Sequence, residues 1–177
     1  MSLYVFGYGS LMWRPGFPFE ERSLATIRGR HRRLCVLSFV HRGTEARPGL
    51  VLGLDRGGAC RGVVFRVAAE RRAEVIDYLR ERELVTDVYV ERHVPATFDD
   101  GRVVDALVYV VDRSHRQYAG RLSLDETLAR VRGAVGRSGR NEDYVISTAD
   151  HLTECGVADP RLHTLAARLR QLEGEGA

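Results

Sequence analysis

Runs of strand-forming residues fill the first two thirds of the chain, and amphipathic helical patterns fill the last third. Two of the later runs are joined by Asp99-Asp100-Gly101, which predicts a hairpin turn. Strands that precede helices, and do not alternate with them, favour an α+β fold with a mixed or closed sheet. The apolar runs that we interpret as strands are residues 3–5, 34–37, 50–52, 62–67, 88–98 and 103–111.

Four segments have the pattern of helices. One predicted helix, over about residues 70–83, interrupts the strands. Later in the chain, Ser123 and Glu126 have the spacing of a capping box. Asn141 is predicted to be the N-cap of the next helix, and Asp159-Pro160 to open the last one. The last third of the chain is therefore expected to be helical.

Length and charge place bounds on the class of protein. The chain has 177 residues and shows no repeat, low-complexity run or linker, so we expect a single domain over residues 1–177. All 27 basic residues are arginine, but acidic residues are interspersed and the net charge is only +3, which disfavours a nucleic-acid-binding surface. Apolar runs are too short for a membrane span, and no secretory pattern opens the chain. These features predict a cytoplasmic protein without a membrane partner.

Cysteine and histidine spacing argues against a metal site. Cys35, Cys60 and Cys155 are odd in number and widely separated, with no CxxC pair. The six histidines form no HxxxH or HxH pair. We therefore predict no disulfide, no metal and small buried thiols.

A loop rich in glycine follows the first strand. In "FGYGSL", Gly7 and Gly9 flank Tyr8, which lets the backbone turn and approach a ligand closely. Successive N–H groups in such a loop form a site for an anion or a polarised carbonyl. The third glycine of a dinucleotide fingerprint is absent, and a tight turn without a ligand is the alternative. The candidate binding residues here are Val5, Phe6, Gly7, Tyr8, Gly9, Ser10 and Leu11.

A second candidate lies at the end of the predicted helix over residues 70–83. Glu83 falls on the same helical face as Ile76 and Leu79, whereas Glu74 and Glu81 project to the other side. Burial and the negative end of the helix dipole both raise the pKa of such a carboxyl group, which suits a general base. The alternatives are a helix that ends earlier, leaving Glu83 solvated, or an ion pair with an arginine.

A third candidate is "GRSGRN", residues 136–141, which connects two predicted helices. Backbone N–H groups at the start of the second helix, together with Arg140, have the chemistry to hold a carboxylate. The alternative is a connector with a capped helix and no ligand.

Taken together, these stretches resemble the ChaC-like γ-glutamylcyclotransferases. "VFGYGSLMWRPGF" is similar to the N-terminal signature of the family, and "HRG" at residues 41–43 with Pro48-Gly49 to a second block. "YLRERE" is similar to the block whose last glutamate is catalytic, and "SGRNEDY" to a fourth. The order and spacing agree from about residue 4 to 170.

The resemblance implies a mixed β-barrel flanked by helices, with no metal and no organic cofactor. It implies that Glu83 is the catalytic residue, and that residues 5–11, Arg140, Asn141 and Tyr144 contact the substrate. The implied reaction converts the γ-glutamyl group of glutathione to 5-oxoproline and releases Cys-Gly. The chain departs from the family after Glu83, where some members carry "KGGY" and Tyr89 arrives two positions later.

Two kinds of alternative remain open at this point. The same fold acts on other γ-glutamyl amines or amino acids in related cyclotransferases. A non-catalytic γ-glutamyl-binding protein, or an arginine-rich protein that binds nucleic acid, belongs to a different class. The sequence does not determine the oligomeric state.

Overall fold

The computed structural model describes residues 1–176 and divides them into two compact units. The barrel unit comprises Met1–Arg32 and Leu54–His115, and the helical unit comprises Arg33–Gly53 and the segment from Arg116 onward. Strands β2 and β3 contribute residues to both units. The expectation of a single domain stays a prediction.

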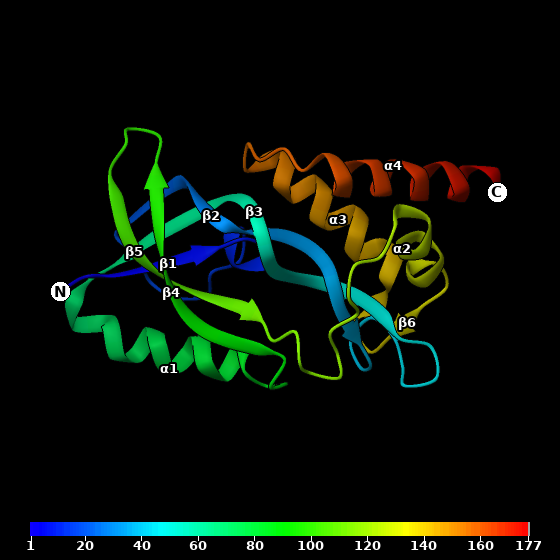
Figure 1. The fold of residues 1–177 in the computed structure, drawn as a ribbon, viewed down its shortest axis with the longest axis horizontal. Helices are drawn as coiled ribbons and strands as arrows, with labels where there is room; N and C mark the ends of the chain where they lie inside the picture. Colours follow the sequence, from blue (N-terminus) through cyan, green and yellow to red (C-terminus); the bar gives the residue numbers. More distant parts are fainter. Residues whose placement is uncertain (177) are drawn as a thin grey trace. The chain divides into compact units, whose positions relative to one another are not determined.

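Five strands form a closed barrel in the order β1-β3-β2-β4-β5 (Figure 1). β1 pairs antiparallel with β3, from Leu3 opposite Val67 to Gly7 opposite Val63. It also pairs in parallel with β5, where Val5 lies opposite Leu107. This parallel pair joins the two ends of the sheet, so the predicted mixed, closed sheet is confirmed. The strands are β1 (Leu3–Gly7), β2 (Glu21–Ser38), β3 (Gly49–Val67), β4 (Tyr89–Phe98) and β5 (Val103–Val111).

The prediction of many short strands is wrong for the middle of the chain. The apolar runs at 50–52 and 62–67 belong to one strand of 19 residues, β3. Between them lies a polar and glycine-rich stretch in which Gly57 and Gly58 have φ angles of 101° and 67°. β3 lies between β1 and β2 in the barrel, and glycines inside a strand mark a bend in it. Propensity alone therefore divided one bent strand into two.

Helix α1 (Arg72–Glu83) follows a short 3-10 turn, η2 (Ala69–Arg71), and confirms the helix predicted over residues 70–83. Val75 and Leu79 are fully buried on one side of α1. The hairpin between β4 and β5 is also confirmed, since Gly101 occupies the turn with a φ of 88°. β4 and β5 then keep a regular antiparallel register from Tyr89 opposite Val111 to Thr97 opposite Val103.

The helical unit contains α2 (Leu124–Val131), α3 (Asn141–Glu154), α4 (Pro160–Glu175) and the short strands β6 (Val135–Gly136) and β7 (Gly139–Arg140). Helices α3 and α4 pack side by side (Figure 1). The capping box is confirmed, because the Ser123 hydroxyl accepts from the N–H of Glu126 and the Glu126 carboxylate accepts from the N–H of Ser123. The Asp159 side chain accepts from the N–H of Leu162 at the start of α4.

The prediction that Asn141 caps α3 is wrong. The N-cap position belongs to Arg140, and no side chain caps this helix. Asn141 is the first helical residue, is fully buried, and uses its amide on a strand. Its Oδ1 accepts from the N–H of Leu50 at 2.7 Å, and its Nδ2 donates to the Leu50 carbonyl at 2.8 Å. A buried peptide group needs a partner more than an exposed helix end does, since water satisfies the latter.

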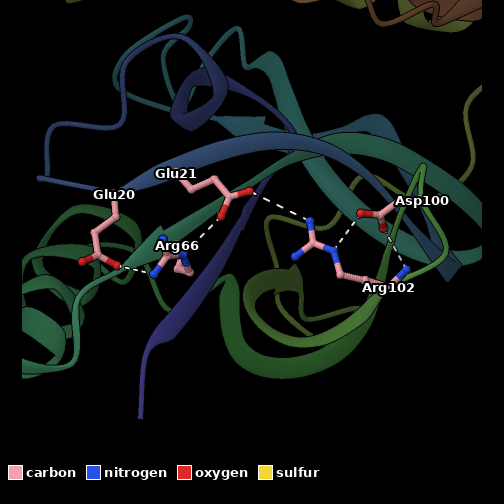
Figure 2. Close-up of polar contacts among 5 residues, drawn as sticks. All are labelled: Glu20, Glu21, Arg66, Asp100 and Arg102. Carbon is pink, nitrogen blue, oxygen red and sulfur yellow. Dashed lines mark hydrogen bonds and ion pairs between the residues drawn. The ribbon is translucent and has the colours of Figure 1, made fainter.

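A chain of exposed ion pairs links the start of β2, β3 and the β4–β5 turn (Figure 2). Arg66 pairs with Glu20 at 2.5 Å and with Glu21 at 3.2 Å. Arg102 lies 4.0 Å from Glu21 and pairs with Asp100 at 2.7 Å. Exposed pairs contribute about 0–1 kcal/mol each to the free energy of unfolding, so this network stabilises the barrel only modestly.

Candidate active site

The loop "FGYGSL" leaves the barrel at the end of β1. Val5 and Phe6 are buried strand residues, the chain bends at Tyr8 and Gly9, and Ser10–Met12 forms one turn of 3-10 helix, η1. The N–H of Met12 donates to the Gly9 carbonyl at 2.9 Å. The N–H groups of Ser10 and Leu11 open this turn and have no partner inside it. The loop therefore carries two backbone donors directly after Gly9, and their contact with a substrate stays a prediction.

Glu83 is the last residue of α1, and its side chain is 20% exposed. Glu81 is exposed and the side chain of Glu74 is 64% exposed, so the assignment of helical faces is confirmed. Burial raises the pKa of Glu83, and the neighbouring Arg82 charge opposes that rise. The alternative of a solvated Glu83 is therefore wrong. The alternative of an arginine partner is correct, and Glu83 is both paired with Arg82 and largely buried.

Arg82 connects Glu83 to the loop. Its Nε lies 3.3 Å from Oε1 of Glu83, and its Nη2 donates to Oγ of Ser10 at 3.0 Å. Its Nη1 donates to the carbonyl oxygens of Arg14 at 2.7 Å and Pro15 at 3.0 Å. The structure thus brings together the predicted carboxylate and the predicted loop through a residue that sequence reasoning missed.

A buried tyrosine also lies within electrostatic reach of Glu83. Tyr109 on β5 is 2% exposed, and its hydroxyl donates to Oε2 of Glu91 on β4 at 3.2 Å. Arg80 holds Glu91 through two hydrogen bonds of 2.9 and 3.0 Å and keeps the pKa of that carboxyl low. Burial and the negative charges of Glu91 and Glu83 raise the pKa of Tyr109, so its hydroxyl stays protonated.

Sequence reasoning missed Tyr109 and Glu91, although a signal for them exists. The turn at residues 99–102 fixes the hairpin register and places Glu91 directly opposite Tyr109. Paired residues point to the same face of a sheet. Residues 106–111 of β5 are otherwise apolar, so the register identifies a tyrosine opposite a glutamate as an unusual polar pair.

The other predicted binding residues belong to the helical unit. Arg140 pairs with Glu173 at 2.8 Å, and the amide of Asn141 is taken by Leu50. The hydroxyl of Tyr144 accepts from the N–H of Leu52 at 3.0 Å, and the Arg42 guanidinium lies 5.4 Å from the centre of its ring. Their contact with a substrate stays a prediction.

Within the described part of the chain, no group of three or more His, Cys, Asp or Glu side chains is arranged to hold a metal ion. No helix among residues 1–176 has the length and apolar character needed to cross a membrane.

A closed mixed barrel is the fold that the sequence resemblance predicted, and solved structures confirm it. A yeast γ-glutamylcyclotransferase specific to glutathione superposes with a TM-score of 0.83 at 24% identity, covering 96% of each chain. The chain belongs to the ChaC-like protein family, which it matches over residues 3–172.

Two curated relatives are similar over nearly the whole chain. The glutathione-specific γ-glutamylcyclotransferase of Escherichia coli K12 is 33% identical over 173 residues, which are 98% of this chain and 75% of the relative. The glutathione-specific γ-glutamylcyclotransferase 1 of Danio rerio is 34% identical over 175 residues, 95% of this chain and 89% of the relative.

Proposed function

We propose that the chain is a glutathione-specific γ-glutamylcyclotransferase that acts in the breakdown of glutathione. The observation that carries the proposal is Glu83: a half-buried carboxylate of raised pKa, held by Arg82 beside the loop after β1. The names of the relatives supply the substrate class. A cytoplasmic location is part of the same proposal.

The reaction begins with the substrate's α-ammonium group, which cannot attack while it is protonated. Glu83 accepts a proton from it, and the raised pKa of Glu83 makes it a stronger base than an exposed glutamate. The free amine then attacks the δ-carbonyl carbon of the same γ-glutamyl group. Because the nucleophile and electrophile are in one molecule, the enzyme needs mainly to hold the chain in a ring-forming pose.

Charge then develops on the carbonyl oxygen as the tetrahedral intermediate forms. In this proposal the backbone N–H groups of Ser10 and Leu11, at the start of the 3-10 turn, donate to that oxygen or to the substrate's α-carboxylate. Protonated Glu83 returns its proton to the departing cysteine nitrogen, and the original amide bond breaks. The ring nitrogen loses its second proton, which ends on the released amine as the ammonium group of Cys-Gly. One C–N bond has formed and one has broken, with no water consumed, which yields 5-oxoproline and Cys-Gly.

The direct test is product analysis. Purified protein incubated with glutathione should release 5-oxoproline and Cys-Gly in equal amounts, and EDTA should not reduce the rate. γ-Glutamyl-alanine, supplied in parallel, tests the wider substrate class and should react more slowly. The absence of 5-oxoproline from both compounds would defeat the proposal, and loss of all activity in EDTA would defeat its metal-free chemistry.

Gly9→Val tests the loop. Gly9 lies at a bend, and its carbonyl accepts the hydrogen bond that closes the 3-10 turn. A branched side chain at this position would keep a substrate from approaching the backbone closely. Since a displacement of about 1 Å can cost about 100-fold, we expect kcat/KM to fall by at least about tenfold. Gly9→Ala should be milder, and the thermal midpoint shows whether each variant is folded. If Gly9→Val folds and keeps a parent-like kcat/KM, the loop is a tight turn that binds no ligand.

A further inference from the structure

The guanidinium group of Arg82 is fully committed to two segments of the barrel unit. On the loop side it donates to Ser10 Oγ and to the carbonyls of Arg14 and Pro15, at 2.7–3.0 Å. On the helix side its Nη1 donates to the Tyr78 hydroxyl at 3.1 Å and its Nε lies 3.3 Å from Glu83. One side chain therefore connects the segment after β1 to the end of α1.

This contact needs arginine in particular. The five N–H donors of a guanidinium group lie in one rigid plane, whereas lysine offers a single point of attachment. The Arg82 side chain is only 23% exposed, so these bonds lie largely away from water. A change to lysine keeps the charge but cannot reach the loop and the helix at the same time.

The loop itself is shaped to pass close to Arg82. Gly16 has a φ of 75°, which favours glycine, and a Cβ at this position would lie 2.0 Å from the Tyr78 hydroxyl and 3.5 Å from Nη1 of Arg82. The chain at residues 14–16 therefore rests directly on the pair formed by Tyr78 and Arg82.

We propose that Arg82 is a positioning residue that fixes the loop of residues 8–16 at a set distance from the carboxylate of Glu83. The proposal rests on the proposed function, because it assigns the loop to the γ-glutamyl group and Glu83 to its amine. If the loop drifts, the δ-carbonyl and the base lose their common geometry, and the substrate binds less often in the ring-forming pose.

The charge of Arg82 has a second consequence. The charged and titratable groups that interact with Glu83 are Arg82 on α1 and Tyr109 on β5, whose hydroxyl donates to Glu91 of β4. Among them Arg82 carries the positive charge that stabilises the charged form of Glu83, while burial disfavours that form and raises its pKa. Removal of this positive charge should move the titration of Glu83 to higher pH, and the acid limb of kcat/KM with it.

Two variants separate geometry from charge. Arg82→Lys keeps the positive charge but loses the planar set of N–H donors. Arg82→Gln loses both the charge and that set of donors. Arg71→Gln is the matched control, since Arg71 forms only an exposed pair with Glu74 and contacts neither loop nor base. The rate of amide hydrogen exchange in residues 10–16 measures how often the loop opens. ¹³C NMR of the Glu83 carboxyl carbon measures the titration of Glu83. Neither measurement needs substrate.

We expect loop exchange to accelerate by at least about tenfold in both Arg82 variants, as when a charge-assisted hydrogen bond is lost. KM for glutathione should rise in both. The Glu83 titration should stay near the parent value in Arg82→Lys and move to higher pH in Arg82→Gln. Arg71→Gln should match the parent in every measurement.

Parent-like loop exchange in folded Arg82→Lys and Arg82→Gln would overturn the positioning role, and an unmoved Glu83 titration in Arg82→Gln would overturn the effect of the Arg82 charge. If Arg82→Gln does not fold, Ser10→Ala removes one contact without altering α1, and unchanged exchange there would equally overturn the role. Exchange and NMR need no turnover, so failure of the parent protein to form 5-oxoproline would defeat the proposed function alone.

Discussion

Glu83→Gln should lower kcat by at least about 100-fold, the low end for loss of a positioned acid–base group. Glutamine has the size of glutamate and can still hydrogen bond, but it cannot accept the proton of the substrate ammonium. Binding of glutathione should survive, because Ser10, Arg14 and Pro15 keep their contacts with Arg82 and the loop keeps its position. Stopped assays give kcat, and calorimetry gives the dissociation constant.

The same variant should be as stable as the parent, or more stable, at neutral pH. The folded pKa of Glu83 lies above its unfolded value, so the folded state binds more protons between the two. The parent therefore loses stability as pH rises through that window, and glutamine does not. Urea unfolding should show the difference at pH 7 and not below the unfolded pKa.

The controls for Glu83→Gln are the glutamates on the other side of α1. Glu81 is exposed, and Glu74 is 64% exposed and paired with Arg71, so both glutamine variants should retain near-parent kcat. Equal losses at Glu81 and Glu83 would mean that the helix face does not select the base. Parent-like turnover in Glu83→Gln would remove the mechanism altogether.

The largest stability effect is expected at Asn141, in the helical unit. Asn141→Leu keeps much of the volume but leaves the N–H and C=O of the fully buried Leu50 without their partner. Two buried, unsatisfied backbone groups cost about 1–3 kcal/mol each, so we expect a loss of roughly 2–6 kcal/mol in the free energy of unfolding. Urea unfolding curves measure it.

Asn141→Ser tells this bridge apart from the helix cap that the sequence predicted. Serine is a good N-cap, so a capping role would be preserved by this change. Serine is too short to accept from and donate to Leu50 as the amide does, so the structure predicts a loss close to that of leucine. Near-parent stability of Asn141→Ser would restore the capping interpretation.

Local patterns were enough for the elements that depend on neighbours in sequence. The helix that ends at Glu83, its buried face and the turn at Gly101 follow from periodicity and turn chemistry. Contacts between distant residues were not accessible in this way. The length of β3 depends on its partner strands. Asn141 contacts Leu50, which is 91 residues away, and Arg82 contacts Ser10, which is 72 residues away. Only a folded chain defines such pairs.

The pairing of β1 has a consequence for how the protein is made. Its partners on either side are β3 and β5, and the residue opposite Val5 on β5 is Leu107. A ribosome adds roughly 5–20 residues per second, so the first strand waits for several seconds before its second neighbour exists. The loop that follows β1 is therefore among the first segments synthesised, but the barrel beside it closes only after β5 has been made. A nascent chain that stops short of β5 carries the whole candidate loop and Glu83, yet has no closed barrel to hold them.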